Sequence, residues 1–312
     1  MRKKALIILK RVAILAFLAL ITLVVVNKAR AMDWPEVLSA LRAYDVSGVG
    51  VAFALGVPAY LACAGFDLIG RHVTGHRLPV LRTSLISFTG YFFSLNLGAL
   101  VGGLAFRYRL YMPYGLSGMT ISQIIGLSVM TNWSGYVVIA GAVIAYQPPE
   151  LPPGWEVGSA VLRATGIVLL CLAAAYVALC VTNGGSTLKV KDLEFQIPSI
   201  GVAAVQFILS VISWGSIGAV ITWLLKGEVS WFALMPVLMM SAIAGIWSHI
   251  PSGLGVTEVV FLSLLGHVVP ESRLLAAILV FRITYYIVPF VLAALAYFYL
   301  EATAKRAGRA AF

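Results

Sequence analysis

The chain contains repeated apolar segments long enough to cross a lipid bilayer. Segments of about 18 or more apolar residues with almost no charge are typical of transmembrane helices. Of the 312 residues, 61% are hydrophobic and 11% are charged, and a soluble domain of this size does not need so much apolar surface. We therefore predict an all-α, polytopic membrane protein with a single transmembrane domain over residues 1–312. Full spans are expected near residues 10–27, 46–69, 118–146, 158–182, 199–225 and 272–300.

The positive charges lie between the apolar segments and predict the topology. The net charge is +10, which on a soluble protein would suggest a nucleic-acid partner. Here the positions of Lys and Arg favour contact with anionic lipid headgroups instead, and we expect no nucleic acid. Fifteen of the 22 Lys and Arg residues lie in residues 1–11, 71–82, 107–109, 183–197 and 301–312. The positive-inside rule places these stretches, and with them both termini, in the cytosol.

The N-terminus allows two interpretations. A basic stretch and an apolar stretch precede Ala29-Arg30-Ala31, which resembles a signal-peptidase site, so cleavage within residues 1–31 is one of them. The other is an uncleaved first span. We favour the second because apolar residues begin at Ala5 and lengthen the segment.

Two apolar segments, 83–106 and 230–268, contain glycines and polar residues at mid-length. The charge pattern gives the first segment two cytosolic flanks and the second segment two external flanks, so each is predicted to be re-entrant. Irregular backbone at membrane depth is tolerated only where protein or water covers it, which implies a protein-lined cavity. The alternative is two ordinary spans with glycine kinks.

The second break, within GIWSHIPSGLGVTEVVF, suggests an anion-binding site. Pro251 lacks an N–H group and disfavours helix before it, while Gly253 and Gly255 permit unusual backbone angles. A helix should restart near Val256, with Ser252 or Thr257 as its N-cap. The N-terminus of such a helix attracts anions, and in a bilayer the expected anion is a lipid phosphate.

Glu258 and Arg282 are ionisable residues placed at membrane depth. Glu258 follows the second break, and Arg282 lies about ten residues into the last predicted span, roughly 15 Å deep. A charge at that depth costs roughly 2.5–3.5 kcal/mol on insertion scales, so we expect the two side chains to pair. The pair has either a structural role or that of a gate that substrate opens. Glu258 alternatively caps its own helix.

The first break contains Gly98, Gly102 and Gly103 and is followed by Arg107 and Arg109. Arginine binds phosphate oxygens well, so these two residues are candidate substrate ligands; the alternative is a plain cytosolic anchor. The sequences FFSLNLGALVGG and IWSHIPSGLGVTE share an aromatic-Ser pair followed by spaced glycines. Opposite entry sides would make the two segments an inverted repeat of the kind found in transporters. Ordinary Gly and Ser contacts between membrane helices explain the same pattern.

The stretch HIPSGLGVTEVVFLSLLGHVVPESRLLAAILVFRITYYIVP resembles the membrane domain of lysylphosphatidylglycerol synthetases. In SLNLGALVGGLAFRYRLYMPYGLS the family's other glycine-rich signature is matched, except that Asn96 and Leu97 stand where a proline is expected. The resemblance implies a lipid-translocating module. In the full synthetases a soluble C-terminal domain aminoacylates phosphatidylglycerol, and this chain ends about a dozen residues after its last predicted span. We therefore expect no aminoacyltransferase domain here. In the first of these two stretches, the residues that match the family's pattern are Pro251, Gly253, Gly255, Glu258, Gly266 and Arg282.

These observations favour a multi-pass inner-membrane protein, not an enzyme, that moves an anionic phospholipid or lipid-linked substrate between leaflets. An accessory or scaffold subunit of a lipid-synthesis enzyme is the alternative, and an intramembrane hydrolase with Ser252 and His249 is a third hypothesis. We expect no cofactor and no metal. The predicted substrate-binding residues are Arg107, Arg109, Gly253, Gly255, Thr257, Glu258 and Arg282, with hinges at Gly98, Gly102, Gly103, Pro251 and Ser252.

Overall fold

The computed structural model describes residue 30 and residues 33–149, 151, 158–190, 193–248 and 250–309. The predicted span at 10–27 and the Ala29-Arg30-Ala31 site fall largely outside these residues. Six described helices are long and apolar enough to cross a membrane, which confirms the prediction of an all-α polytopic protein. They are Val46–Thr74, Gly118–Tyr146, Ser159–Asn183, Ile200–Leu224, Trp231–Ser248 and the continuous helix Glu271–Ala304.

Short surface elements connect these helices. α2 (Trp34–Arg42) precedes α3 (Val46–Thr74), whose first turn is capped by the side chain of Asp45. α6 (Gly118–Tyr146) and α8 (Ile200–Leu224) begin in the same way at Ser117 and Ser199. β1 (Thr187–Val190) and β2 (Leu193–Gln196) form an antiparallel hairpin between α7 (Ser159–Asn183) and α8, with Thr187 opposite Gln196.

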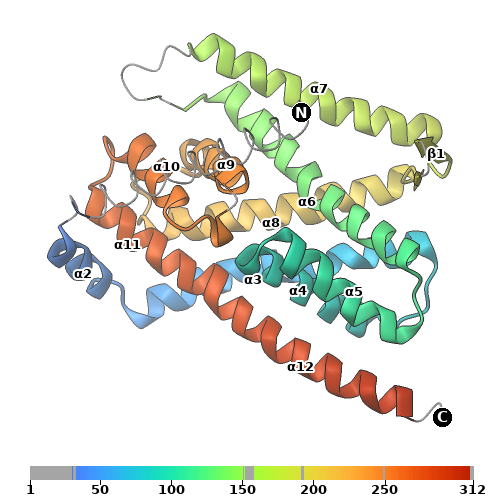
Figure 1. The fold of residues 1–312 in the computed structure, drawn as a ribbon. Helices are drawn as coiled ribbons and strands as arrows, with labels where there is room; N and C mark the ends of the chain where they lie inside the picture. The colour runs from blue at the N-terminus through green and yellow to red at the C-terminus, as the bar shows by residue number, and fades with distance from the viewer. Residues whose placement is uncertain are drawn as a thin grey trace, which may run out of the picture.

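The helix bundle has two ends, which we name by the elements that lie there (Figure 1). The α2 end holds α2, residues 225–230 and residues 266–270; Tyr44 donates to the Leu224 carbonyl there and Trp223 to the Gly48 carbonyl. The β1 end holds the β-hairpin, residues 75–79 and residues 112–117. α3 runs from the α2 end to the β1 end, and α8 runs in the opposite direction. Each of these helices therefore connects the two ends of the bundle.

The two interrupted segments fold into helical hairpins. The first hairpin consists of α4 (Val80–Leu97), the π-helix η1 (Ala99–Ala105) and α5 (Phe106–Tyr111), followed by the 3-10 turn η2 (Met112–Tyr114). The second hairpin consists of α9 (Trp231–Ser248), the 3-10 turn η3 (Pro251–Gly253) and α10 (Val256–Leu265). The first begins and ends at the β1 end, and the second begins and ends at the α2 end.

The last long helix packs against the first hairpin. It is divided into α11 (Glu271–Phe281), the π-helix η4 (Arg282–Ile287) and α12 (Val288–Arg309), and it runs diagonally across the bundle in Figure 1. Its aromatic side chains meet those of α4: Phe92 packs edge-on against Tyr285, and Phe93 lies against Phe290. The core therefore surrounds the turn of the first hairpin and holds it against η4.

Candidate site at the contact between the two hairpins

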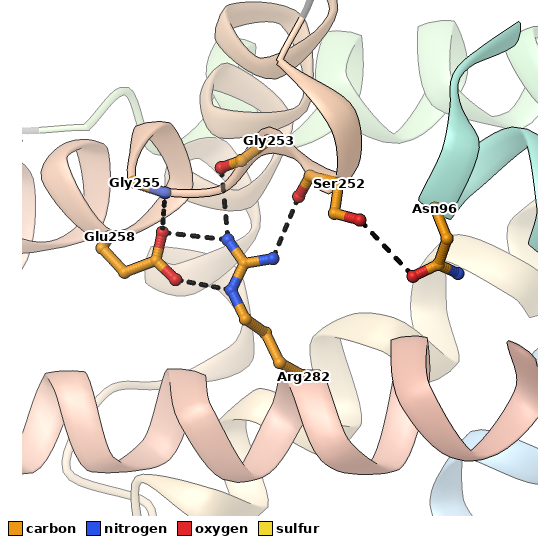
Figure 2. A network of polar contacts seen from close by, with 6 residues as sticks. All are labelled: Asn96, Ser252, Gly253, Gly255, Glu258 and Arg282. Carbon is orange, nitrogen blue, oxygen red and sulfur yellow. Dashed lines mark hydrogen bonds and ion pairs between the residues drawn. The ribbon is translucent and has the colours of Figure 1, made fainter. Parts of the chain in front are cut away.

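The turns of the two hairpins touch each other in the middle of the bundle. The Ser252 hydroxyl in η3 donates to Oδ1 of Asn96, near the end of α4, over 3.4 Å. The amide of Asn96 in turn donates to the Phe92 carbonyl at 2.8 Å and to the Tyr286 carbonyl of η4 at 3.4 Å. Asn96 thus links both hairpins and the last helix, as Figure 2 shows for its contact with Ser252.

The second turn depends on left-handed backbone angles. Ser252, Gly253 and Gly255 have φ values of 59°, 57° and 79°. Such angles are strained for serine and easy for glycine. α10 begins at Val256 as expected, but the predicted caps Ser252 and Thr257 are wrong, because Gly255 is the N-cap and Oε2 of Glu258 accepts from its N–H at 2.8 Å. A carboxylate three residues on from the N-cap satisfies that N–H without a hydroxyl cap.

Arg282 connects α10 and the second turn to η4. Its Nε donates to Oε1 of Glu258 at 2.5 Å, and Nη2 donates to Oε2 at 2.9 Å. Nη1 donates to the Ser252 carbonyl at 3.0 Å, and Nη2 also reaches the Gly253 carbonyl at 3.2 Å. The expected pairing of Glu258 with Arg282 is confirmed, and Glu258 also caps its helix (Figure 2).

The surroundings of this ion pair strengthen it. The side chains of Arg282 and Glu258 are 8% and 15% exposed, and the guanidinium lies 5.3 Å from the ring centroid of Tyr286. Away from water a bidentate arginine–carboxylate pair is strong, and removing one partner leaves a charge buried without compensation. Arg282 begins the π-helix η4, a form that occurs often at functional sites.

The turn of the first hairpin is tight in a different way. α4 ends at Leu97, and Gly98 has a φ of 89°. η1 folds back so closely that a Cβ on Gly102 would lie 1.9 Å from the Phe93 carbonyl oxygen, and one on Gly103 would lie 2.9 Å from the Ser94 hydroxyl. Only glycine permits this approach of two backbones. The predicted break residues therefore lie at the turn of the first hairpin.

Arg107 lies in the interior and is paired with an acid that sequence reasoning missed. Its Nε donates to Oδ2 of Asp67 in α3 at 3.2 Å, and Nη2 donates to the Ser128 hydroxyl of α6 at 3.1 Å. Tyr111 donates to the same Oδ2 at 2.9 Å. Asp67 is fully buried and Arg107 is 4% exposed, so Arg107 ties the first hairpin to α3 and α6 and is no surface anchor.

Arg109 points to the outside of the bundle. Its side chain is 62% exposed and donates to Oε1 of Glu301 in α12 at 2.5 Å. Tyr297, which also donates to Glu301, lies under its guanidinium. The pair stands at the β1 end, at the outer edge of the first hairpin.

The predicted residues thus fall into two groups. Pro251, Ser252, Gly253, Gly255, Thr257, Glu258 and Arg282 come together at the second turn, where the Thr257 hydroxyl lies beside Gly253. Arg107 and Arg109 direct their hydrogen bonds to α3, α6 and α12. Asp67 is a lone acid in an apolar helix. Like Glu258, it was detectable from the sequence as an ionisable residue at membrane depth. His249, needed for the hydrolase hypothesis, lies outside the described residues.

The sequence matches a known family over nearly its whole length. The family model described as "Lysylphosphatidylglycerol synthase TM region" matches residues 7–293. The chain belongs to this family. Its geometry shows how the family region is built in this chain: two hairpins that enter from opposite ends, joined through Asn96, Ser252 and Arg282.

Two relatives extend the comparison. Inner membrane protein YbhN of Escherichia coli (strain K12) is 40% identical over 294 residues, which cover 94% of this chain and 92% of the relative. Uncharacterized protein slr0712 of Synechocystis is 29% identical over 261 residues, covering 82% and 80%. Together with the apolar helices, these matches make this family member a multi-pass inner-membrane protein.

Proposed function

We propose that this protein moves an anionic phospholipid, or another phosphate-bearing lipid, between the two leaflets of the membrane. In this proposal the hairpins are re-entrant, the first from the cytosolic side and the second from the outside, with the chain termini in the cytosol. The contact of their turns beside the Glu258–Arg282 pair is the observation that carries the proposal. The family is named for lysylphosphatidylglycerol synthase, and this name supports a lipid substrate.

The hydrogen bonds of Arg282 suggest how a headgroup would open this contact. The guanidinium holds one carboxylate and two carbonyl oxygens of the second turn. A phosphate offers the same bidentate geometry as a carboxylate, so it can replace Glu258 as the partner of Arg282. Release of Glu258 also frees the N–H of Gly255, and the first turn of α10, with Thr257, then faces the phosphate with N–H groups.

The same exchange would separate the two turns. Once Arg282 binds phosphate, its hydrogen bonds to Ser252 and Gly253 weaken, and the turns stay joined by the 3.4 Å hydrogen bond between Ser252 and Asn96. A headgroup would then pass between them while its acyl chains stay in lipid. Arg109, exposed at the β1 end and paired with Glu301, would meet headgroups at the cytosolic leaflet, and Arg107 would hold the first hairpin in place.

The test is lipid movement in liposomes that contain the purified full-length chain. A fluorescent anionic phospholipid is followed by its accessibility to a membrane-impermeant quencher. We expect faster movement than in empty liposomes, slower movement with Glu258→Gln, and an unchanged rate with Glu228→Gln, whose partner Arg273 is exposed. A wild-type rate equal to that of empty liposomes would overturn the proposal.

A further inference from the structure

One of the two oxygens of the buried Asp67 carboxylate has no hydrogen-bond partner among the described residues. Oδ2 accepts hydrogen bonds from Arg107 and Tyr111, at 3.2 and 2.9 Å. Oδ1 is buried and has no hydrogen-bond partner among the described residues. An ionised carboxylate in a medium of low dielectric constant is costly when an oxygen is left unpaired, and taking up a proton removes that cost.

A second unpartnered polar atom lies next to the same tyrosine. His76 stands in the loop between α3 and α4, and its Nδ1 accepts from the N–H of Leu78 at 3.3 Å. Its Nε2 is buried without a partner among the described residues, and its ring lies edge-on to that of Tyr111, with 6.1 Å between centroids. Tyr111 therefore contacts both His76 and the Asp67 carboxylate.

His76 lies within electrostatic reach of both Arg71 and Asp67. Burial and the charge of Arg71 lower the pKa of the His76 imidazole, while the negative charge of Asp67 opposes them. Because Nδ1 accepts from the N–H of Leu78, the neutral imidazole carries its proton on Nε2. Its position at the β1 end puts it between bulk water and the interior.

We propose that Asp67 is a proton-binding site that takes its proton from the β1 end of the bundle, the end at which His76 stands. A proton from bulk water binds Oδ1 of Asp67, the oxygen that has no hydrogen-bond partner among the described residues. The carboxylate becomes a neutral carboxylic acid, and no other bond forms or breaks.

The groups that face Asp67 determine what a change in its charge would do. α3 contributes Cys63 and Arg71 besides Asp67, and α5 contributes Arg107 and Tyr111. α4 and α6 contribute the hydroxyls of Ser87 and Ser128. Arg107 is the cation in direct contact with Asp67. A proton on Asp67 removes the counter-charge of Arg107 and weakens the tie between the first hairpin and α3.

Only one part of this inference rests on the proposed function, namely that proton binding is coupled to lipid movement. Loosening of the first hairpin would shift Asn96 away from Ser252, so protons entering at the β1 end would favour separation of the two turns. The proton is then the coupling ion of lipid movement. Proton binding itself can be measured without any lipid substrate.

The direct experiment is infrared difference spectroscopy of the full-length chain in lipid nanodiscs, titrated from about pH 8 to about pH 5. We expect a carbonyl band of a protonated carboxylic acid that grows as the pH falls. The band should be lost in Asp67→Asn and retained in Asp45→Asn, an exposed aspartate at an N-cap where asparagine serves equally well. Persistence of the whole band in Asp67→Asn would overturn the proposal.

A second measurement covers the case in which Asp67→Asn does not fold. Wild-type protein with ¹³C-labelled aspartate carboxyl groups should show the band shifted to lower frequency. A band that ignores the aspartate label would also overturn the proposal. In liposomes, an applied proton gradient should change the rate of lipid movement several-fold in wild type, and the change should be lost in Asp67→Asn.

The two proposals fail separately. A titrating Asp67 in a protein that does not move lipid would contradict the proposed function and leave the proton site in place. Lipid movement without protonation of Asp67 would contradict the proton site and leave the proposed function in place.

Discussion

The two hairpins hold their arginines in opposite ways. At the second hairpin, Arg282 of η4 forms four hydrogen bonds, two of them to the carboxylate of Glu258. Arg107 of the first hairpin reaches Asp67 through one nitrogen at 3.2 Å, and the carboxylate keeps an unpartnered oxygen. The buried ion pair of Arg282 is therefore saturated with hydrogen bonds and suited to exchange with a competing anion, and that of Arg107 is incomplete and suited to take up a proton.

The turns differ as well. The first turn depends on the contact of two backbones at Gly102, and the second depends on positive φ angles at Ser252, Gly253 and Gly255. A close contact of backbones tolerates no added atom, whereas a left-handed turn is strained at serine and can relax when its hydrogen bonds to Arg282 are released. We therefore regard the second turn as the part that moves and the first as its support.

The largest expected effect is that of Arg282→Ala. It leaves Glu258 charged without its partner and two carbonyls of the second turn without a donor, so the free energy of unfolding should fall by about 3–5 kcal/mol. Thermal unfolding of the protein in detergent measures this loss.

The matched control is Arg273→Ala, which breaks the exposed pair with Glu228 at the α2 end. Exposed ion pairs contribute about 1 kcal/mol or less, so its unfolding midpoint should stay close to that of wild type. Equal losses in both variants would show that the Arg282 network contributes no more than a surface contact.

Gly102→Ala should have the next largest effect. The added Cβ would overlap the Phe93 carbonyl, so α4 and η1 must separate, at a cost of about 1–3 kcal/mol. Gly126→Ala in α6 meets no atom within 4 Å and replaces glycine within a helix, so it should stabilise by about 0.5–1 kcal/mol. A stabilised Gly102→Ala variant would contradict the close contact, and unfolding midpoints of the two variants decide it.

The smallest expected effect is a pH dependence from His76. Because the pKa of folded His76 lies below its ordinary value of 6.5, the unfolded chain binds more protons just below that pH. This contribution to stability is present above about pH 6.5 and is lost as the pH falls from there through the lower pKa of the folded state. In His76→Gln the unfolding midpoint should fall less between pH 7 and pH 5.5 than in wild type. The difference between the two falls is the pH-dependent contribution of the His76 imidazole to stability. The control is the exposed His72→Gln, which should follow wild type.

The sequence predicted the helices and the breaks well because both follow from local properties. Uninterrupted apolar length identified five of the six described candidate spans, and the glycines and Pro251 located both turns. The Glu258–Arg282 pair followed from the cost of two charges at membrane depth. Such inferences need no knowledge of which helices are neighbours.

The remaining features depend on tertiary packing. The pairing of Arg107 with Asp67 requires that α3 and α5 lie side by side, and the sequence interval of 40 residues does not reveal this. The joining role of Asn96 likewise depends on the meeting of two turns that are 156 residues apart. The N-cap at Gly255 was not predicted because glycine carries no capping side chain, although capping of this helix by Glu258 was one of the expected alternatives.

The most direct test of lipid passage between the hairpins is to lock their two turns together. We would introduce Asn96→Cys and Ser252→Cys into a chain with Cys171→Ser, since Cys63 and Cys180 are buried, and join them with a short bifunctional thiol reagent. In liposomes, we expect the cross-linked protein to move a fluorescent anionic phospholipid no faster than empty liposomes, and the unlinked double variant to move it at close to the wild-type rate. Equal, fast movement before and after cross-linking would contradict the claim that lipid passes where the hairpins meet.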